Sequence, residues 1–316
     1  MSTGVLPNCG PTRQGSIVLP PGRRIFGWND DAPRLWATSE PVPDAGRVWR
    51  ELTGLSGETG LVPIVLAFLD GGHEGRPWDE GELEKPNDLA SVGSVAATTV
   101  LAENWSGNLP DDEEEFDEDA AAEVAPFGLR FPGLAPRQNH SLADAEAAQA
   151  LNLIGSARIG LVPASRPADV LALIGHDTVN RDSDPRPLAA VLRSWEDRFG
   201  ATLLEVGFAH IRLLAQRPPR ALPDAQAVAA ELWAMCDEFW PAGTMTLGRS
   251  AAARLVPPAD AARALVAGFL GLELLATLDG DREAALAVFD RAHSLARMLD
   301  ILGGIRLPSR RTDEPA

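Results

Sequence analysis

Residues 190–208 read AVLRSWEDRFGATLLEVGF, and they hold the end of a predicted helix, a glycine stop and a predicted strand. From residue 188 the apolar side chains recur every three or four positions, which is the period of one helix face. Gly200 follows this run where helices commonly end in a left-handed residue. Residues 201–208 are mostly apolar and predict a strand. The predicted helix face comprises Leu188, Val191, Leu192, Trp195 and Phe199.

The segments around this stretch extend the pattern in both directions. Asp184 and Pro185 are typical of a helix start, and a short strand with a second helix precedes them. A further strand and a helix opened by Pro223 follow. The order strand, helix, helix, strand, strand, helix predicts an α+β fold, a small mixed sheet with packed helices. The other predicted elements are strand 159–164, a helix from a Ser165 cap to 174, strand 210–215 and the helix after 223, whose apolar face carries Val228, Leu232, Met235 and Phe239.

One core is expected to join these elements. It takes the helix face above together with Leu203 and Val206 of the strand and Val228 and Leu232 of the last helix. Apolar side chains on packed faces supply most of the stability of such a domain.

The rest of the chain predicts three further parts. Residues 1–110 form an acidic N-terminal α+β region with a loosely ordered start up to residue 21, a helix at 46–55 and a strand at 61–69. Residues 111–157 form an acidic linker with a short helix at 141–151, and residues 158–246 form the domain described above. Residues 247–316 predict a helical hairpin with a turn at Gly280.

Charge is distributed unevenly over the 316 residues. Residues 1–160 carry 25 acidic and 11 basic residues, a net charge of −14, and the whole chain has a net charge of −17. Such a surface repels phosphate backbones, so nucleic acids and anionic membranes are excluded as expected partners, and a basic protein is favoured. The block DDEEEFDED at 111–119 predicts a solvated linker, because it lacks the spacing of an EF-hand, and we expect no metal site.

The cysteine content and the N-terminus predict a cytoplasmic protein. Cys9 and Cys236 are the only cysteines, with no CxxC pair and no disulfide framework. The first thirty residues lack the pattern of a signal peptide. The most apolar stretch, 261–278, is too short and too charged to span a bilayer.

Three segments carry a family resemblance. LVPASRPADVLALIG at 161–175, the stretch at 190–208 and AVAAELWAMCDEFW at 227–240, with Asn180 and Pro218-Pro219 between them, resemble the actinobacterial domain-of-unknown-function family 4253. The resemblance implies no activity. The family often has Gly-Trp where this chain has Gly175-His176, and Glu-His where it has Glu231-Leu232. If the family uses that second histidine for chemistry, this chain has lost it.

The C-terminal part, 249–304, is similar to the last two helices of TetR-type regulators, which form a dimer interface in that family. No helix-turn-helix precedes it, so the resemblance implies a homodimer through the hairpin and no DNA binding.

Candidate catalytic residues are few. His176 and Asp177 form a histidine–carboxylate pair in a polar loop that also holds Asn180 and Arg181, and Cys236 is a thiol on a predicted helix. A histidine in such a loop can be a general base or a metal ligand, or the loop can simply form turns and caps. His210 is interpreted as a satisfied sheet residue.

Binding is therefore favoured over catalysis. Asn180, Arg181, Trp233 and Trp240 are the candidate binding residues, because tryptophans off the main apolar stripe can anchor an interface, although they can equally pack inside the protein. No Walker, nucleotide-binding or zinc-protease motif is present in the sequence, and we expect no cofactor. The leading hypothesis is a non-enzymatic, cytoplasmic protein-interaction module for a protein partner, with a basic toxin as one example. The alternative is an enzyme that uses the loop at 176–182.

Overall fold

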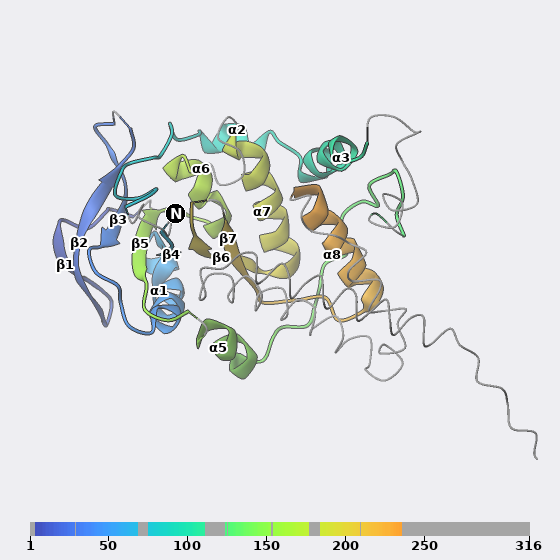
Figure 1. The fold of residues 1–316 in the computed structure, drawn as a ribbon. Coiled ribbons are helices and arrows are strands. Elements are labelled where there is room, and N and C mark those ends of the chain that lie inside the picture. The colour runs from blue at the N-terminus through green and yellow to red at the C-terminus, as the bar shows by residue number, and fades with distance from the viewer. Residues whose placement is uncertain are drawn as a thin grey trace, which may run out of the picture. The chain divides into compact units, whose positions relative to one another are not determined.

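The structure is a computed structural model that describes residues 4–235 except positions 29, 69–74, 111–123, 125, 153, 177–183 and 209 (Figure 1). The chain separates into two compact units. The first contains residues 1–101 and 136–218, and the second contains residues 102–135 and 219–316. The predicted hairpin at 247–316 and the acidic block at 111–119 lie outside the described residues.

The first unit is built on a seven-stranded mixed sheet in the order β1-β2-β3-β5-β4-β6-β7. Only β4 and β6 pair in parallel among these neighbours, and the remaining pairs are antiparallel. A sheet with helices packed on it confirms the predicted α+β class. The strands are β1 (Gly10–Gln14), β2 (Ile17–Phe26), β3 (Pro33–Thr38), β4 (Leu61–Leu66), β5 (Arg158–Pro163), β6 (Ala201–Val206) and β7 (Ile211–Ala215).

The sheet does not divide at residue 158, where a domain boundary was expected. β5 pairs with β3 on one side and with β4 on the other, and both of those strands come from the first hundred residues. Strand pairing over about a hundred residues of chain is a long-range interaction that local sequence patterns do not report. The expected loose start is also corrected, because β1 and the first half of β2 form an antiparallel hairpin there.

Helices cover both faces at the centre of the sheet, since all six residues of β4 are buried. α1 (Ala45–Thr59) packs on β4, and α5 (Asp144–Asn152) packs on α1. α7 (Pro185–Phe199) packs on β6, on α6 (Val170–Ile174), on α2 (Leu89–Gly93) and on the 3₁₀ turn η1 (Pro167–Asp169). The first core therefore lies between α1 and the sheet, around Trp36, Trp49 and Val65.

The stretch at 190–208 folds as predicted, into the end of α7, a stop at Gly200 and the strand β6. The Asp184 carboxylate accepts the Arg186 N–H at 3.0 Å and caps α7, and Gly200 ends that helix in the left-handed conformation with φ 60°. The predicted Ser165 cap is wrong, because Arg166 occupies the N-cap position of η1 without a side-chain bond. The buried members of the expected core are Leu188, Val191, Leu192, Trp195, Phe199, Leu203 and Val206.

Val228 and Leu232 do not belong to that core. They lie on α8 (Leu222–Met235), which is part of the second unit, and both are only half-buried. The helix instead buries a different face, made of four alanines with Glu231 and Trp233. Small alanines let a helix approach its neighbours closely, and the large indole fills the space beside them.

The core of the second unit is aromatic. The rings of Trp105, on α3 (Ala97–Gly107), and Trp233 meet edge-to-face with centroids 4.6 Å apart, and Phe127 and Phe131 contact Trp105 as well. The fully buried Glu231 carboxylate accepts the Ala135 N–H at 2.6 Å. Edge-to-face geometry is the arrangement that aromatic quadrupoles favour.

Within the described part of the chain, no helix is both long and apolar enough to cross a membrane.

Candidate functional site

His176, the first residue of the predicted polar loop at 176–182, is buried. It follows Gly175, the left-handed residue that ends α6, and only 2% of its surface is exposed. Its ring lies 5.1 Å from the ring of Trp78, centroid to centroid. Trp78 in turn donates its indole N–H to the Ala67 carbonyl, directly after β4, at 2.8 Å. His176 therefore packs against Trp78.

Of the other predicted site residues, Trp233 alone lies in the described part of the chain. Asp177, Asn180, Arg181, Cys236 and Trp240 lie outside the described residues. Trp233 is buried at 2% exposure, so it is not a surface anchor, and the alternative of internal packing holds for it.

A histidine that the sequence interpretation set aside lies at the carboxyl end of the parallel strand pair. Nε2 of His210 lies 2.9 Å from Oε1 of the buried Glu205, near the end of β6. Arg212 donates to the other carboxylate oxygen of Glu205 at 3.2 Å. Gly207 makes room for this contact, because a Cβ there would lie 2.3 Å from the imidazole. The predicted strands at 201–208 and 210–215 follow each other closely, and a hairpin between them would have indicated that residues 205 and 210 lie close together.

Ion pairs hold the loop at residues 75–83 against the same end of the sheet. Asp79 pairs with Arg158, at the start of β5, at 3.0 Å and with Arg23 of β2. Arg76 pairs with Glu82 through two guanidinium nitrogens, and its guanidinium also lies 4.7 Å above the Phe208 ring. The hydrogen bond to Glu82 raises the pKa of Arg76. Partly exposed pairs like these contribute little individually, but together they fix the conformation of the loop.

This ordered loop supports an exposed aromatic turn after β2. Trp28 is 74% exposed and the neighbouring Phe26 is 42% exposed. The backbone beneath them is tied down, because the Trp28 N–H donates to the Leu83 carbonyl at 3.2 Å. A Cβ at Gly27 would lie 2.8 Å from that carbonyl, so the close approach requires glycine. We call Phe26, Gly27 and Trp28 the aromatic turn.

Exposed carboxylates lie close along the chain to the aromatic turn and to the residues that hold it. Glu80 and Glu84 flank residues 81–83, which hold the turn, and Asp31 follows it along the chain. All three residues are exposed. A large aromatic side chain beside exposed carboxylates is suited to a cationic partner, which the ring attracts through its quadrupole and the acids through charge.

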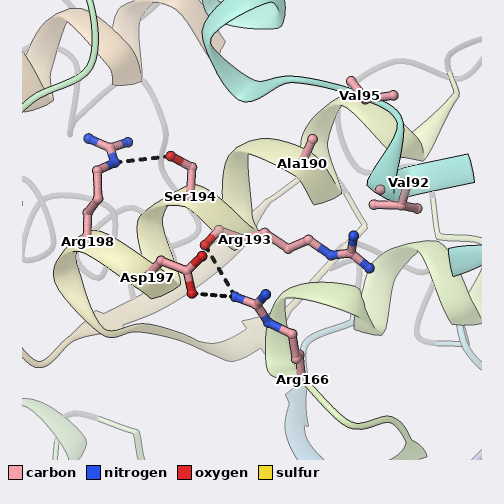
Figure 2. A pocket seen from close by; sticks show the side chains of 9 residues that line it. Val92, Val95, Arg166, Ala190, Arg193, Ser194, Asp197 and Arg198 are labelled. Carbon is pink, nitrogen blue, oxygen red and sulfur yellow. Dashed lines mark hydrogen bonds and ion pairs between the residues drawn. The ribbon is translucent and has the colours of Figure 1, made fainter. Parts of the chain in front are cut away.

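A second feature is a surface pocket of about 390 Å³ on α7, lined by three arginines (Figure 2). Arg166 donates to Glu196 at 3.3 Å and to Asp197 at 2.7 Å. Arg193 donates to the buried Asp169 at 2.5 Å. Burial alone would lower the pKa of Arg166, but Glu196 and Asp197 raise it above its ordinary value. Burial raises the pKa of Glu196, against the opposing effect of Arg166.

Comparison with protein families matches residues 158–260 to the domain of unknown function DUF4253. The chain carries a DUF4253 domain. Comparison with curated proteins finds no match, and comparison with solved structures finds none either.

The DUF4253 domain begins in the middle of the sheet. Its first residue, Arg158, starts β5, which is hydrogen-bonded on both sides to strands that precede the domain. The Glu205–His210 pair and the pocket arginines lie inside the DUF4253 domain, whereas the aromatic turn lies before it. Sequence reasoning missed the aromatic turn because a tryptophan is usually buried, and nothing local to residue 28 indicates its exposure.

Proposed function

We propose that the protein is a non-enzymatic, cytoplasmic interaction module that binds a basic segment of a protein partner through the aromatic turn. The observation that carries the proposal is the exposed Trp28 side chain on a backbone held by the Leu83 carbonyl. An aromatic anchor that is already ordered before binding loses little conformational entropy on association. Tryptophan is also the residue type most enriched at the energetic centres of interfaces.

Charge supports a basic partner. Asp31, Glu80 and Glu84 are exposed and close along the chain to the aromatic turn or to Leu83, which holds it, and residues 111–123 add nine acids and no base to the chain. Carboxylates at an interface rim accelerate the encounter with an opposite charge and exclude acidic proteins. The two cysteines, of which Cys9 is exposed and free, suit a reducing compartment such as the cytoplasm.

The proposal is tested by capture of partners from an extract of the cells that encode the protein, with the wild type and Trp28→Ser compared quantitatively. Trp28→Ser should remove a specifically captured protein that carries a basic segment, and Glu80→Gln with Glu84→Gln should reduce its capture. Raised salt should weaken the capture because exposed charges are screened. Val5→Ser, which changes another exposed apolar side chain, is the matched control and should leave capture unchanged. Equal capture by wild type and Trp28→Ser would contradict the proposal.

An enzyme remains the second candidate function, and Glu205 with His210 is the observation that favours it. A buried carboxylate that orients a partly exposed histidine is an arrangement used for general base catalysis. In the loop at 176–182, which the sequence suggested for this alternative, residues 177–182 lie outside the described part of the chain. His210→Gln distinguishes the two functions, because it should leave partner capture intact and abolish any turnover.

A further inference from the structure

The pocket on α7 combines charged and apolar walls. Arg166, Arg193, Ser194, Asp197 and Arg198 provide polar groups, and they lie within one unit of the fold with the rest of the lining. The apolar and backbone part of the lining comes from Val92, Gly93, Val95 and Ala190. Figure 2 shows the Arg193 guanidinium extending toward Val92 and the Arg166 guanidinium reaching Asp197. A volume of about 390 Å³ falls within the range of small-molecule sites.

Internal carboxylates orient Arg166 and Arg193, and the hydrogen bonds among the described residues do not use all the donors of these two side chains. Arg193 bonds Asp169 through Nε alone, which leaves Nη1 and Nη2 without a partner among the described residues. Arg166 uses Nε and Nη2, so its Nη1 is also uncommitted within that part of the chain. Arg198 is positioned by a hydrogen bond from its Nε to the Ser194 hydroxyl at 3.0 Å.

The fixed guanidinium groups favour an oxyanion. A guanidinium presents planar, paired N–H donors that match the oxygens of a carboxylate or a phosphate. Asp169 is 2% exposed and already paired with Arg193, so its carboxylate is not available to contact a ligand. Because both arginines are held in place before binding, an anion gains their donors at a reduced entropic cost.

We propose that this pocket binds a small organic anion, whose carboxylate or phosphate group contacts Arg193 and Arg166 while its apolar body lies against Val95 and Ala190. The pocket is separate from the aromatic turn, so this proposal stands or falls independently of the proposed function.

Calorimetry on the full chain tests the proposal with benzoate, phenyl phosphate and inorganic phosphate as probes and benzamide as the uncharged control. Benzoate or phenyl phosphate should bind, and benzamide should not. Tighter binding of benzoate assigns the ligand as a carboxylate, and tighter binding of phenyl phosphate assigns it as a phosphate. Inorganic phosphate should bind more weakly than phenyl phosphate because it lacks the apolar body. No binding of either organic anion, or equal binding of benzamide, overturns the proposal.

A substitution at Gly93 can place a new side chain beside Arg193 in the pocket. A Cβ there would lie 3.8 Å from Nη1 of Arg193, with no closer neighbour, so a side chain fits. Gly93→Asp places a carboxylate beside the guanidinium and should weaken anion binding at least about tenfold, whereas Gly93→Asn and Gly93→Ala should retain it. Unchanged binding by Gly93→Asp would also overturn the proposal.

Arg193→Lys provides an independent readout. Lysine keeps a cation beside Asp169 but removes the two planar Nη donors, so anion affinity should fall by about tenfold while the protein stays folded. Arg47→Lys, on the exposed face of α1, is the matched control and should bind like the wild type. Full affinity in Arg193→Lys would contradict a site built on those donors.

Discussion

Glu205 and His210 meet at 2.9 Å across Gly207, with the imidazole lying where a Cβ at position 207 would stand. The Gly207 N–H also donates to the His210 carbonyl at 2.9 Å, so both the backbone and the side chain of His210 turn back onto β6. The glycine is therefore needed for steric reasons, to let a histidine reach a buried carboxylate.

Gly207→Ala is expected to destabilise the protein by about 1–3 kcal/mol, because the added methyl group must displace the imidazole or the backbone. Denaturant unfolding measures this change. Gly54→Ala is the matched control, since nothing lies within 4 Å of a Cβ there and alanine in place of glycine within a helix should stabilise by about 0.5–1 kcal/mol.

A double-mutant cycle identifies the cause of that destabilisation. In a chain that already carries His210→Ala, Gly207→Ala should have a much smaller effect, because the ring that it displaces is gone. An unchanged effect would place the strain in the backbone and contradict the steric explanation.

Trp195→Ala is expected to cost about 3–5 kcal/mol of unfolding free energy, as for other large aromatic residues truncated in a core. Trp195 is buried on α7, whereas Trp28 is exposed, so the same substitution at position 28 should change stability by less than about 0.5 kcal/mol. Equal denaturant midpoints for wild type and Trp195→Ala would refute this assignment.

The raised pKa of Glu196 predicts that the stability of the protein depends on pH. Burial raises the pKa of Glu196, so the folded protein binds this proton more tightly than the unfolded chain. The free energy of unfolding should therefore fall as pH rises from the ordinary glutamate pKa through the raised pKa of Glu196. Glu196→Gln cannot titrate and should lack this fall, whereas the exposed control Glu40→Gln should retain it. Parallel pH profiles for wild type and Glu196→Gln would be the contrary result.

Self-association through the C-terminal residues 247–316 stays a prediction from the sequence. Their apolar helical pattern needs a partner surface, and two copies can make a four-helix bundle. Sedimentation of the full chain should give a dimer, and a chain that ends at Thr246 should give a folded monomer. A monomer in both cases rejects the dimer.

Elements whose signals lie within a few residues were predictable from the sequence. The apolar period from Leu188 to Phe199, the cap at Asp184 and the stop at Gly200 define α7 because helix periodicity and end capping are local interactions. The hairpin of β6 and β7 follows from two apolar runs separated by a short turn. These local features were sufficient for the α+β class and for seven of the nine expected core residues.

The combination of distant segments depends on long-range packing, which local sequence patterns do not encode. β5 lies between β3 and β4 because strands separated by about a hundred residues pair there, and no local pattern encodes that choice. The position of Val228 and Leu232 outside the first core and the burial of His176 against Trp78 depend on such long-range packing. The exposure of Trp28 has the same origin, since the Leu83 carbonyl that holds its backbone lies 55 residues away along the chain.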